Sequence, residues 1–179
     1  MRIISGIYKG RRFEAPQIIP VRPTTDMARE ALFSILNSQR DIDGSAVLDL
    51  FAGIGSISLE FLSRGASSVT AIDMNSECLS FIRSVADKWG AEGLTLQRQD
   101  AFAYPGNTNK KFDIIFADPP YQAPNIAEIP DIIFKSKILN DNGIFVLEHS
   151  KKYDFSGIAQ FKEVRRYGKI HFSFFVNVD

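Results

Sequence analysis

The tetrapeptide Asp118-Pro119-Pro120-Tyr121 follows the apolar run FDIIFA at 112–117 and combines an acid, two prolines and an aromatic ring. Proline fixes φ and lacks a backbone N–H, so the prolines present a rigid rim of carbonyl acceptors beside the Asp118 carboxylate. Acceptors without donors suit an NH2 group. Hydrogen bonds from an exocyclic base amine to Asp118 and to the Pro119 carbonyl favour a pyramidal nitrogen that can attack a methyl group, mainly through positioning and electrostatics. Tyr121 offers a ring on which an extruded base can stack.

A second motif is the loop DLFAGIG at 49–55, which ends the apolar run AVLDL and precedes a helical pattern. Its glycines allow the backbone to approach a ligand without an intervening side chain. Asp73 stands 20 residues beyond Gly53, at the end of the next predicted strand, where a carboxylate can accept two hydrogen bonds from a ribose diol. Loop and acid together indicate an adenosine-containing cofactor, either a nicotinamide dinucleotide or S-adenosylmethionine.

Two features favour S-adenosylmethionine. Ser58 occupies the position where the dinucleotide fingerprint has its third glycine or an alanine. Asp49 lies just before the loop, where a carboxylate would repel a pyrophosphate but suits the ammonium group of a methionine moiety.

Asp100, after the third predicted strand, is placed to meet an adenine amino group. Phe51 is placed to line a sulfonium pocket, because a cation beside an aromatic ring is favourable.

The hydrophobic pattern predicts strands that alternate with helices. In such a fold the motifs, which follow predicted strands, can lie at one edge of a sheet. Strands are predicted at 46–50, 68–73, 94–97, 112–117, 143–147, 164–167 and 171–176, and helices at about 25–37, 56–64, 78–89 and 125–135. The first fifteen residues predict a short hairpin, followed by a proline-punctuated loop. The expected fold class is α/β, a Rossmann-like, doubly wound, mainly parallel seven-stranded sheet with an antiparallel C-terminal hairpin and a small N-terminal β-hairpin extension. Ligands are expected at the carboxyl ends of its strands.

Size and composition predict one domain over 1–179, with a basic hairpin and loop extension at 1–21 and a catalytic core at 22–179. The apolar runs are too short for a bilayer crossing, and the amino terminus lacks the apolar stretch of a secretory signal, so a cytoplasmic protein without membrane contact is expected. Cys78 is the only cysteine and there are two histidines, so neither an internal disulfide nor a metal is expected.

The net charge of zero conceals a marked asymmetry along the chain. Residues 1–40 carry a balance of +4 and residues 151–179 a balance of +3, which leaves −7 for the segment between them. An acidic body with two basic flanks suggests a site that holds a polyanion at its rim, and ordinary solvated surface is the alternative explanation.

With these residues in view, the chain resembles class I S-adenosylmethionine-dependent methyltransferases and, within them, the bacterial RsmD family, which methylates the N2 amine of a guanine in small-subunit (16S) rRNA. The resemblance spans nearly the whole chain. It is carried by RIISGIYKGRR at 2–12, RPTTDMAREALFSIL at 22–36, DLFAGIGSISLEFLSRGA at 49–66, DPPY at 118–121 and LEHS at 147–150.

The resemblance implies S-adenosylmethionine as cofactor, S-adenosylhomocysteine as product and no metal. The expected cofactor-binding residues are Thr25, Asp49, Phe51, Ala52, Gly53, Gly55, Asp73, Met74, Asp100, Ala101 and Asp118. Asp118 to Tyr121 would hold the guanine, and the expected RNA contacts are Lys9, Arg11, Arg12, Arg22 and Arg29. The implied partner is small-subunit rRNA or the assembling small ribosomal subunit, bound by a monomer.

Two alternatives stay open at this point. DPPY also permits an adenine-N6 methyltransferase acting on RNA or DNA, and the fold permits a non-catalytic RNA-binding assembly factor. His149 lies just past the fifth predicted strand, but a general base is unnecessary because the methylated amine can lose its proton to water.

Overall fold

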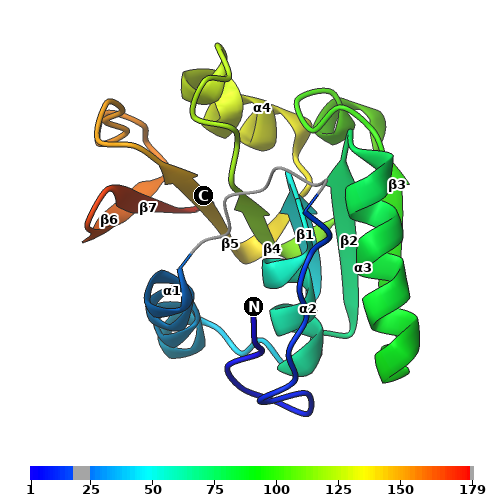
Figure 1. Ribbon diagram of the computed structural model, residues 1–179. Coiled ribbons are helices and arrows are strands. Elements are labelled where there is room, and N and C mark those ends of the chain that lie inside the picture. The colour runs from blue at the N-terminus through cyan, green and yellow to red at the C-terminus, as the bar shows by residue number, and fades with distance from the viewer. Residues whose placement is uncertain (18–24, 178–179) are drawn as a thin grey trace.

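The computed structural model describes residues 1–17 and 25–177 and contains a seven-stranded sheet in the order β3-β2-β1-β4-β5-β7-β6 (Figure 1). The strands are β1 Ala46–Leu50, β2 Ser68–Asp73, β3 Leu94–Arg98, β4 Phe112–Ala117, β5 Leu139–His149, β6 Phe161–Tyr167 and β7 Ile170–Val176. The first five pair in parallel, whereas β7 runs antiparallel to both β5 and β6. The predicted fold class is thereby confirmed.

Helices cover both faces of this sheet. They are α1 Asp26–Gln39, α2 Ser56–Ser63, α3 Ser76–Trp89 and α4 Ile129–Ser136, with short 3-10 turns η1 Tyr104–Asn107 and η2 Ile126–Glu128. One buried cluster joins alternate strand residues such as Val47 and Phe116 to α1, α2 and α3. A second cluster joins the intervening residues, such as Leu48 and Phe145, to η1 and α4. Because side chains alternate across a strand, every second residue faces the α1–α3 layer.

The helix starts are set by local chemistry. The Thr25 hydroxyl accepts from the Ala28 N–H and caps α1, and the Asn75 side chain caps α3 by accepting from Glu77 and Cys78. At its other end α3 stops at Gly90, which adopts a left-handed conformation. In the described residues no helix combines the length and the apolar character needed to cross a bilayer.

The amino-terminal segment reverses direction as expected, but it pairs through a single bridge between Arg2 and Arg12 and forms no extended strands. Backbone hydrogen bonds cross the reversal, among them the 2.9 Å bond from the Ile3 N–H to the Arg11 carbonyl, and the segment runs beside α2 in Figure 1. The buried Glu60 carboxylate accepts from the backbone N–H groups of Ile4 (2.8 Å) and Ser5 (3.0 Å), and the Ile7 N–H donates to the Ser63 carbonyl. These contacts fix the segment against α2.

Candidate active site

A cavity of about 770 Å³ opens at the carboxyl ends of the parallel strands. It is walled by the loop after β1, the ends of β2 and β4, the turn after β3, and residues of β5 and the β6–β7 turn. This is where ligands bind in doubly wound sheets. The volume lies within the range of about 300 to 1,000 Å³ that is usual for ligand sites.

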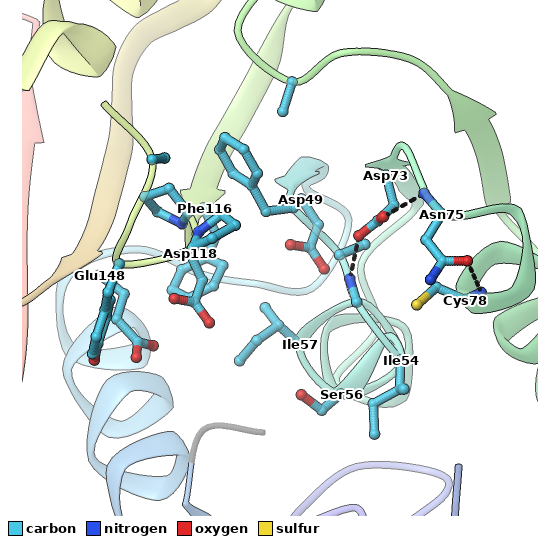
Figure 2. Close-up of a pocket in the computed structure, with 18 of the residues that line it drawn as sticks. Asp49, Ile54, Ser56, Ile57, Asp73, Asn75, Cys78, Phe116, Asp118 and Glu148 are labelled. Atoms are coloured by element: carbon cyan, nitrogen blue, oxygen red, sulfur yellow. Dashed lines mark hydrogen bonds between the residues drawn. The ribbon is translucent and has the colours of Figure 1, made fainter. Parts of the chain in front are cut away.

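Each of the five parallel strands brings one acid to this cavity, and the acids follow the order of the strands. The five are Asp100 after β3, Asp73 on β2, Asp49 on β1, Asp118 after β4 and Glu148 on β5. Figure 2 shows Asp73, Asp49, Asp118 and Glu148 one after another across the pocket. We call these five residues the acid row.

The glycine loop is tied to the acid row by Asp73. The Gly53 N–H donates to Asp73 Oδ2 at 2.8 Å, and the Asn75 N–H donates to Oδ1 at 2.8 Å. Phe51 adopts a positive φ of 64°, an uncommon conformation that recurs at functional sites, and its ring packs on Phe102. The carboxylate therefore joins the two loops that form one end of the cavity.

Gly55, expected from the sequence to bind the cofactor, is not among the described residues that line the cavity. Its φ of 78° is left-handed, and a Cβ there would lie 2.7 Å from Cγ1 of Ile82 on α3. The glycine is needed where the start of α2 packs against α3. The other ten residues expected to bind the cofactor all line the cavity.

Asp49 lies at the middle of the acid row and is fully buried. Its Oδ2 accepts a 2.5 Å hydrogen bond from the Ser58 hydroxyl on α2. Burial raises the pKa of Asp49 to about 7; the Ser58 hydrogen bond lowers it and the nearby Asp73 charge raises it further. A cation placed beside Asp49 would restore the ionised form, which fits the ammonium group of a methionine moiety. Ser58, read in the sequence only as a missing glycine, is the partner of this acid.

Asp118 and Glu148 form the other end of the acid row. Ala117 of β4 is in register with Leu147 of β5, so the next residues on each strand are Asp118 and Glu148. Alternation points both toward the α1–α3 layer, as in Figure 2. Burial, the Glu148 carboxylate and Asp49 raise the pKa of Asp118 well above its usual range. A ligand that donates hydrogen bonds would relieve this crowding of carboxylates.

The rest of the tetrapeptide borders the same end of the cavity. Pro119 is buried, whereas Pro120 and Tyr121 are at the surface, and Tyr121 is 40% exposed. All three line the cavity with Asp118. The structure therefore places an acid, a proline rim and an accessible ring together, as the sequence predicts.

The basic residues expected to bind RNA differ in their exposure. Lys9, Arg11 and Arg12 are exposed, and the Arg11 guanidinium lies over the rings of Tyr8 and Trp89. The turn that carries Lys9 lies at the ends of α2 and α3 away from the cavity, since Tyr8 contacts Ser63 and Trp89. Arg22 lies outside the described residues.

The prediction that Arg29 contacts RNA is wrong. Its side chain is fully buried, and its guanidinium donates to the Arg2 carbonyl (2.7 Å) and to Asp26 Oδ1 (2.8 Å). This arginine instead joins α1 to the amino-terminal segment.

His149 points to the opposite face of β5 from Glu148. One ring nitrogen lies 2.8 Å from the Ser150 carbonyl and the other 2.7 Å from the Ser173 hydroxyl, and the ring lines a separate cavity of about 230 Å³. His149 is therefore not among the residues that line the acid row. In the described part of the chain no group of three or more histidine, cysteine or acidic residues is arranged to hold a metal.

Two charged residues that line the cavity were missed in the sequence. Glu148 stood inside LEHS without an assigned role, although an acid directly after the buried run GIFVL repeats the arrangement of Asp118 after FDIIFA. Lys169, on the turn between β6 and β7, also lines the cavity. No local pattern marked it.

The strand order, the single antiparallel insertion of β7 and the glycine loop with its acid define a class I methyltransferase. A family model described as Conserved hypothetical protein 95 matches residues 1–176. The chain belongs to this family, the RsmD family of S-adenosylmethionine-dependent methyltransferases, as the sequence motifs predict.

Relatives and solved structures agree with this assignment. The chain is 29% identical to Ribosomal RNA small subunit methyltransferase D of Buchnera aphidicola subsp. Baizongia pistaciae, over 100% of this chain and 93% of the relative. It is 30% identical to the protein of the same name from Escherichia coli K12, over 83% and 74%. A solved structure described as putative methyltransferase yhhF from Escherichia coli superposes with a TM-score of 0.85 at 26% identity, over 98% and 96% of the two chains.

Proposed function

We propose that this protein transfers a methyl group from S-adenosylmethionine to the exocyclic N2 amine of a guanine in small-subunit rRNA. The observation that carries the proposal is the half-buried Asp118 at the head of the proline rim, beside Asp49 in one cavity. The names of the relatives, which are ribosomal RNA small subunit methyltransferases, support the rRNA substrate.

The acid row can bind S-adenosylmethionine in one orientation, with the adenine at one end and the ammonium group at its middle. Asp100 can accept from an adenine amino group, Asp73 from a ribose diol and Asp49 from an ammonium group. Thr25, Phe51 and the small residues Ala52 and Ala101 line the space between these acids. When bound, S-adenosylmethionine supplies an electrophilic methyl group on a positively charged sulfur, which keeps the C–S electron pair as the methyl leaves.

The acceptor end is built by Asp118 to Tyr121. The Asp118 carboxylate and the Pro119 carbonyl accept the two N2 protons and hold the nitrogen so that its lone pair points toward Asp49 and the methyl donor. Tyr121 stacks on the extruded base. The N–C bond forms on this lone pair, and the extra proton leaves to water at the exposed side of Tyr121. Positioning and electrostatics carry most of the rate enhancement.

The exposed Lys9, Arg11 and Arg12 supply cations for RNA phosphates outside the cavity. Because the turn that carries Lys9 and Arg11 lies at the far ends of α2 and α3, these two side chains would hold RNA at a distance from the target base. An enzyme of this kind needs such contacts, since the cavity itself is acidic.

The test is transfer of labelled methyl from S-adenosylmethionine to small-subunit rRNA, both naked and assembled, and to duplex DNA, followed by nucleoside chromatography. Asp118→Ala serves as the inactive variant. Asp87→Ala, an exposed acid on α3, is the matched control and should keep wild-type activity. We expect label in N2-methylguanine from rRNA, lost in Asp118→Ala alone.

Other outcomes have distinct meanings. Label in N6-methyladenine would show that the acceptor is adenine and not guanine, while methyl transfer to an exocyclic amine would stand. Binding of S-adenosylmethionine without transfer to any acceptor would instead favour the assembly factor.

A further inference from the structure

We propose that Glu148 and Lys169 read the Watson–Crick edge of the target base and so make guanine the preferred acceptor over adenine. This inference rests on the proposed function and deepens it. It assigns a specificity role to two residues at the acceptor end of the cavity.

The first step is the position of Glu148. Its side chain is almost fully buried, with 3% of the residue exposed, yet it lines the cavity directly beside Asp118. Neighbouring strands lie about 4.8 Å apart, so two carboxylates at adjacent register positions can contact adjacent groups of one planar base. In Figure 2 both side chains extend toward the same space below Phe116.

The second step is the order of groups along the sheet edge. The cofactor, as proposed, occupies the part of the acid row from Asp100 to Asp49. The row continues with Asp118, then Glu148, and the next strand is β7, which begins beside Lys169. The acceptor end thus presents, in strand order, an acceptor, a second acceptor and a donor.

Guanine carries the complementary sequence of groups on one edge. Its N2 amine and its N1–H are donors, and its O6 is an acceptor. With N2 at Asp118, N1–H falls toward Glu148 and O6 toward Lys169. Adenine with N6 at Asp118 would turn its N1 lone pair toward the Glu148 carboxylate, and no base oxygen would reach Lys169.

Lys169 stands out by its charge. Among the described residues that line the cavity it is the one basic side chain, set against the five acids of the acid row. It sits on the exposed turn between β6 and β7, so its flexible stem can follow the base as it enters. An ammonium group there can donate a hydrogen bond to guanine O6 but cannot donate one to a base that has a C–H group at this position.

The crowding of carboxylates supports the same assignment. Burial and the Glu148 carboxylate hold the pKa of Asp118 well above its usual range, because each disfavours a negative charge at Asp118. Two donors on one base edge can give hydrogen bonds to both acids and offset this penalty. A base that offers one donor and one acceptor leaves one of the two carboxylates without a hydrogen-bond donor from the base.

The experiment compares guanine with 2-aminopurine at the target position of the rRNA substrate. 2-Aminopurine keeps the N2 amine but has an unprotonated N1 and no O6. For wild-type protein we expect kcat/KM to favour guanine by about 100-fold or more, since sites built to pair a polar group reject analogues that lack it. The Glu148→Gln amide can accept from N1–H or donate to a bare N1, so this ratio should fall by about tenfold or more.

Lys169→Met tests the second contact independently. It should lower kcat/KM on guanine by about tenfold and leave 2-aminopurine nearly unchanged, because only guanine has O6. Glu92→Gln and Lys110→Met, two exposed positions away from the cavity, are the matched controls and should keep the wild-type ratio. Cofactor affinity and the melting temperature of each variant show that the cavity is intact.

The results separate this inference from the proposed function. A wild-type ratio retained in both variants, with guanine still methylated, would overturn the roles of Glu148 and Lys169 alone. Equal losses on both bases would assign the residues a structural role and overturn the inference as well. Absence of N2-methylguanine from wild-type reactions would overturn the proposed function with it. Since Lys169 is exposed, its variant keeps the test decisive even where Glu148→Gln fails to fold.

Discussion

The Gly53 N–H and the Asp73 carboxylate are joined by a 2.8 Å hydrogen bond that links the loop after β1 to the end of β2. The other oxygen of the same carboxylate accepts from Asn75 at 2.8 Å. Both oxygens have further lone pairs that can accept from a diol. Asp73 is thus held in place before any ligand arrives.

Asp73→Ala is expected to raise the Kd for S-adenosylmethionine by about 10- to 100-fold, the loss typical of hydrogen bonds to a charged group. Asp118→Ala should leave that Kd within about threefold and abolish transfer, because its partner is the acceptor base. Calorimetry measures the first quantity and labelled-methyl transfer the second. The reverse pattern would exchange the two roles.

Cofactor affinity should depend on pH through Asp49. Its pKa of about 7 in the free protein means that the acid is largely protonated below neutrality. Binding of an ammonium group favours the ionised form, so Kd should decrease as pH rises from about 6 to 8. Asp49→Asn should bind more weakly at pH 8 and show a flatter profile. An unchanged pH slope in the variant would remove Asp49 from the ammonium site.

The same group predicts a trend in stability without cofactor. The folded protein keeps the Asp49 proton to about pH 7, whereas the unfolded chain loses it near the ordinary value of 3.8. The folded state therefore binds more protons between these values, and the contribution of Asp49 to the free energy of unfolding decreases as pH rises through this window. Urea unfolding of wild type and Asp49→Asn at pH 4.5 and 7 should show a steeper decline in the wild type.

Glu60 should hold the amino-terminal segment in place. Its buried carboxylate accepts from Ile4, Ser5 and Arg64 Nε, the last at 2.8 Å. Glu60→Ala removes these acceptors and leaves Arg64 without its partner, so we expect a loss of about 3 to 5 kcal/mol in the free energy of unfolding. Early proteolytic cleavage within residues 1–17 should accompany it. Glu92→Ala, at an exposed site, should change neither.

Combined replacement of Lys9, Arg11 and Arg12 by alanine should weaken RNA binding and reduce its dependence on salt, because fewer counterions are released from phosphates. The slope of log K against log salt concentration, measured by filter binding, is the readout. Replacement of Lys110, Lys111 and Lys135, three exposed lysines elsewhere on the molecule, is the charge-matched control. Equal slopes for the two triple variants would contradict a specific role for the amino-terminal segment.

Arg29→Met should show whether Arg29 stabilises the fold or binds RNA. The change leaves the Arg2 carbonyl and Asp26 without a buried donor, so the free energy of unfolding should fall by about 1 to 3 kcal/mol. The salt slope of RNA binding should equal that of the wild type. A reduced slope in a stable Arg29→Met protein would restore the phosphate contact.

The outcome for individual residues shows what local pattern can predict. Asp73 and Asp118 were found from the sequence because each follows a short buried strand, and parallel strands end at one edge. Arg29 was misplaced because its burial depends on the backbone of Arg2, which folds against α1 from a separate segment. Glu148 also ends a buried run, but the sequence does not show that the register between β4 and β5 sets it beside Asp118, 30 residues earlier. Gly55 was found correctly as a required glycine, but the reason lies in Ile82 on another helix.

The acid row also bears on how the enzyme completes a cycle. Methyl transfer removes the positive charge from the sulfonium, so the departing S-adenosylhomocysteine is less cationic than the molecule that entered. A wall of carboxylates attracts the charged form more strongly than the neutral one. The chemical step therefore weakens the electrostatic attraction between the protein and its product. The same carboxylates that attract S-adenosylmethionine thus favour dissociation of S-adenosylhomocysteine before the next turnover.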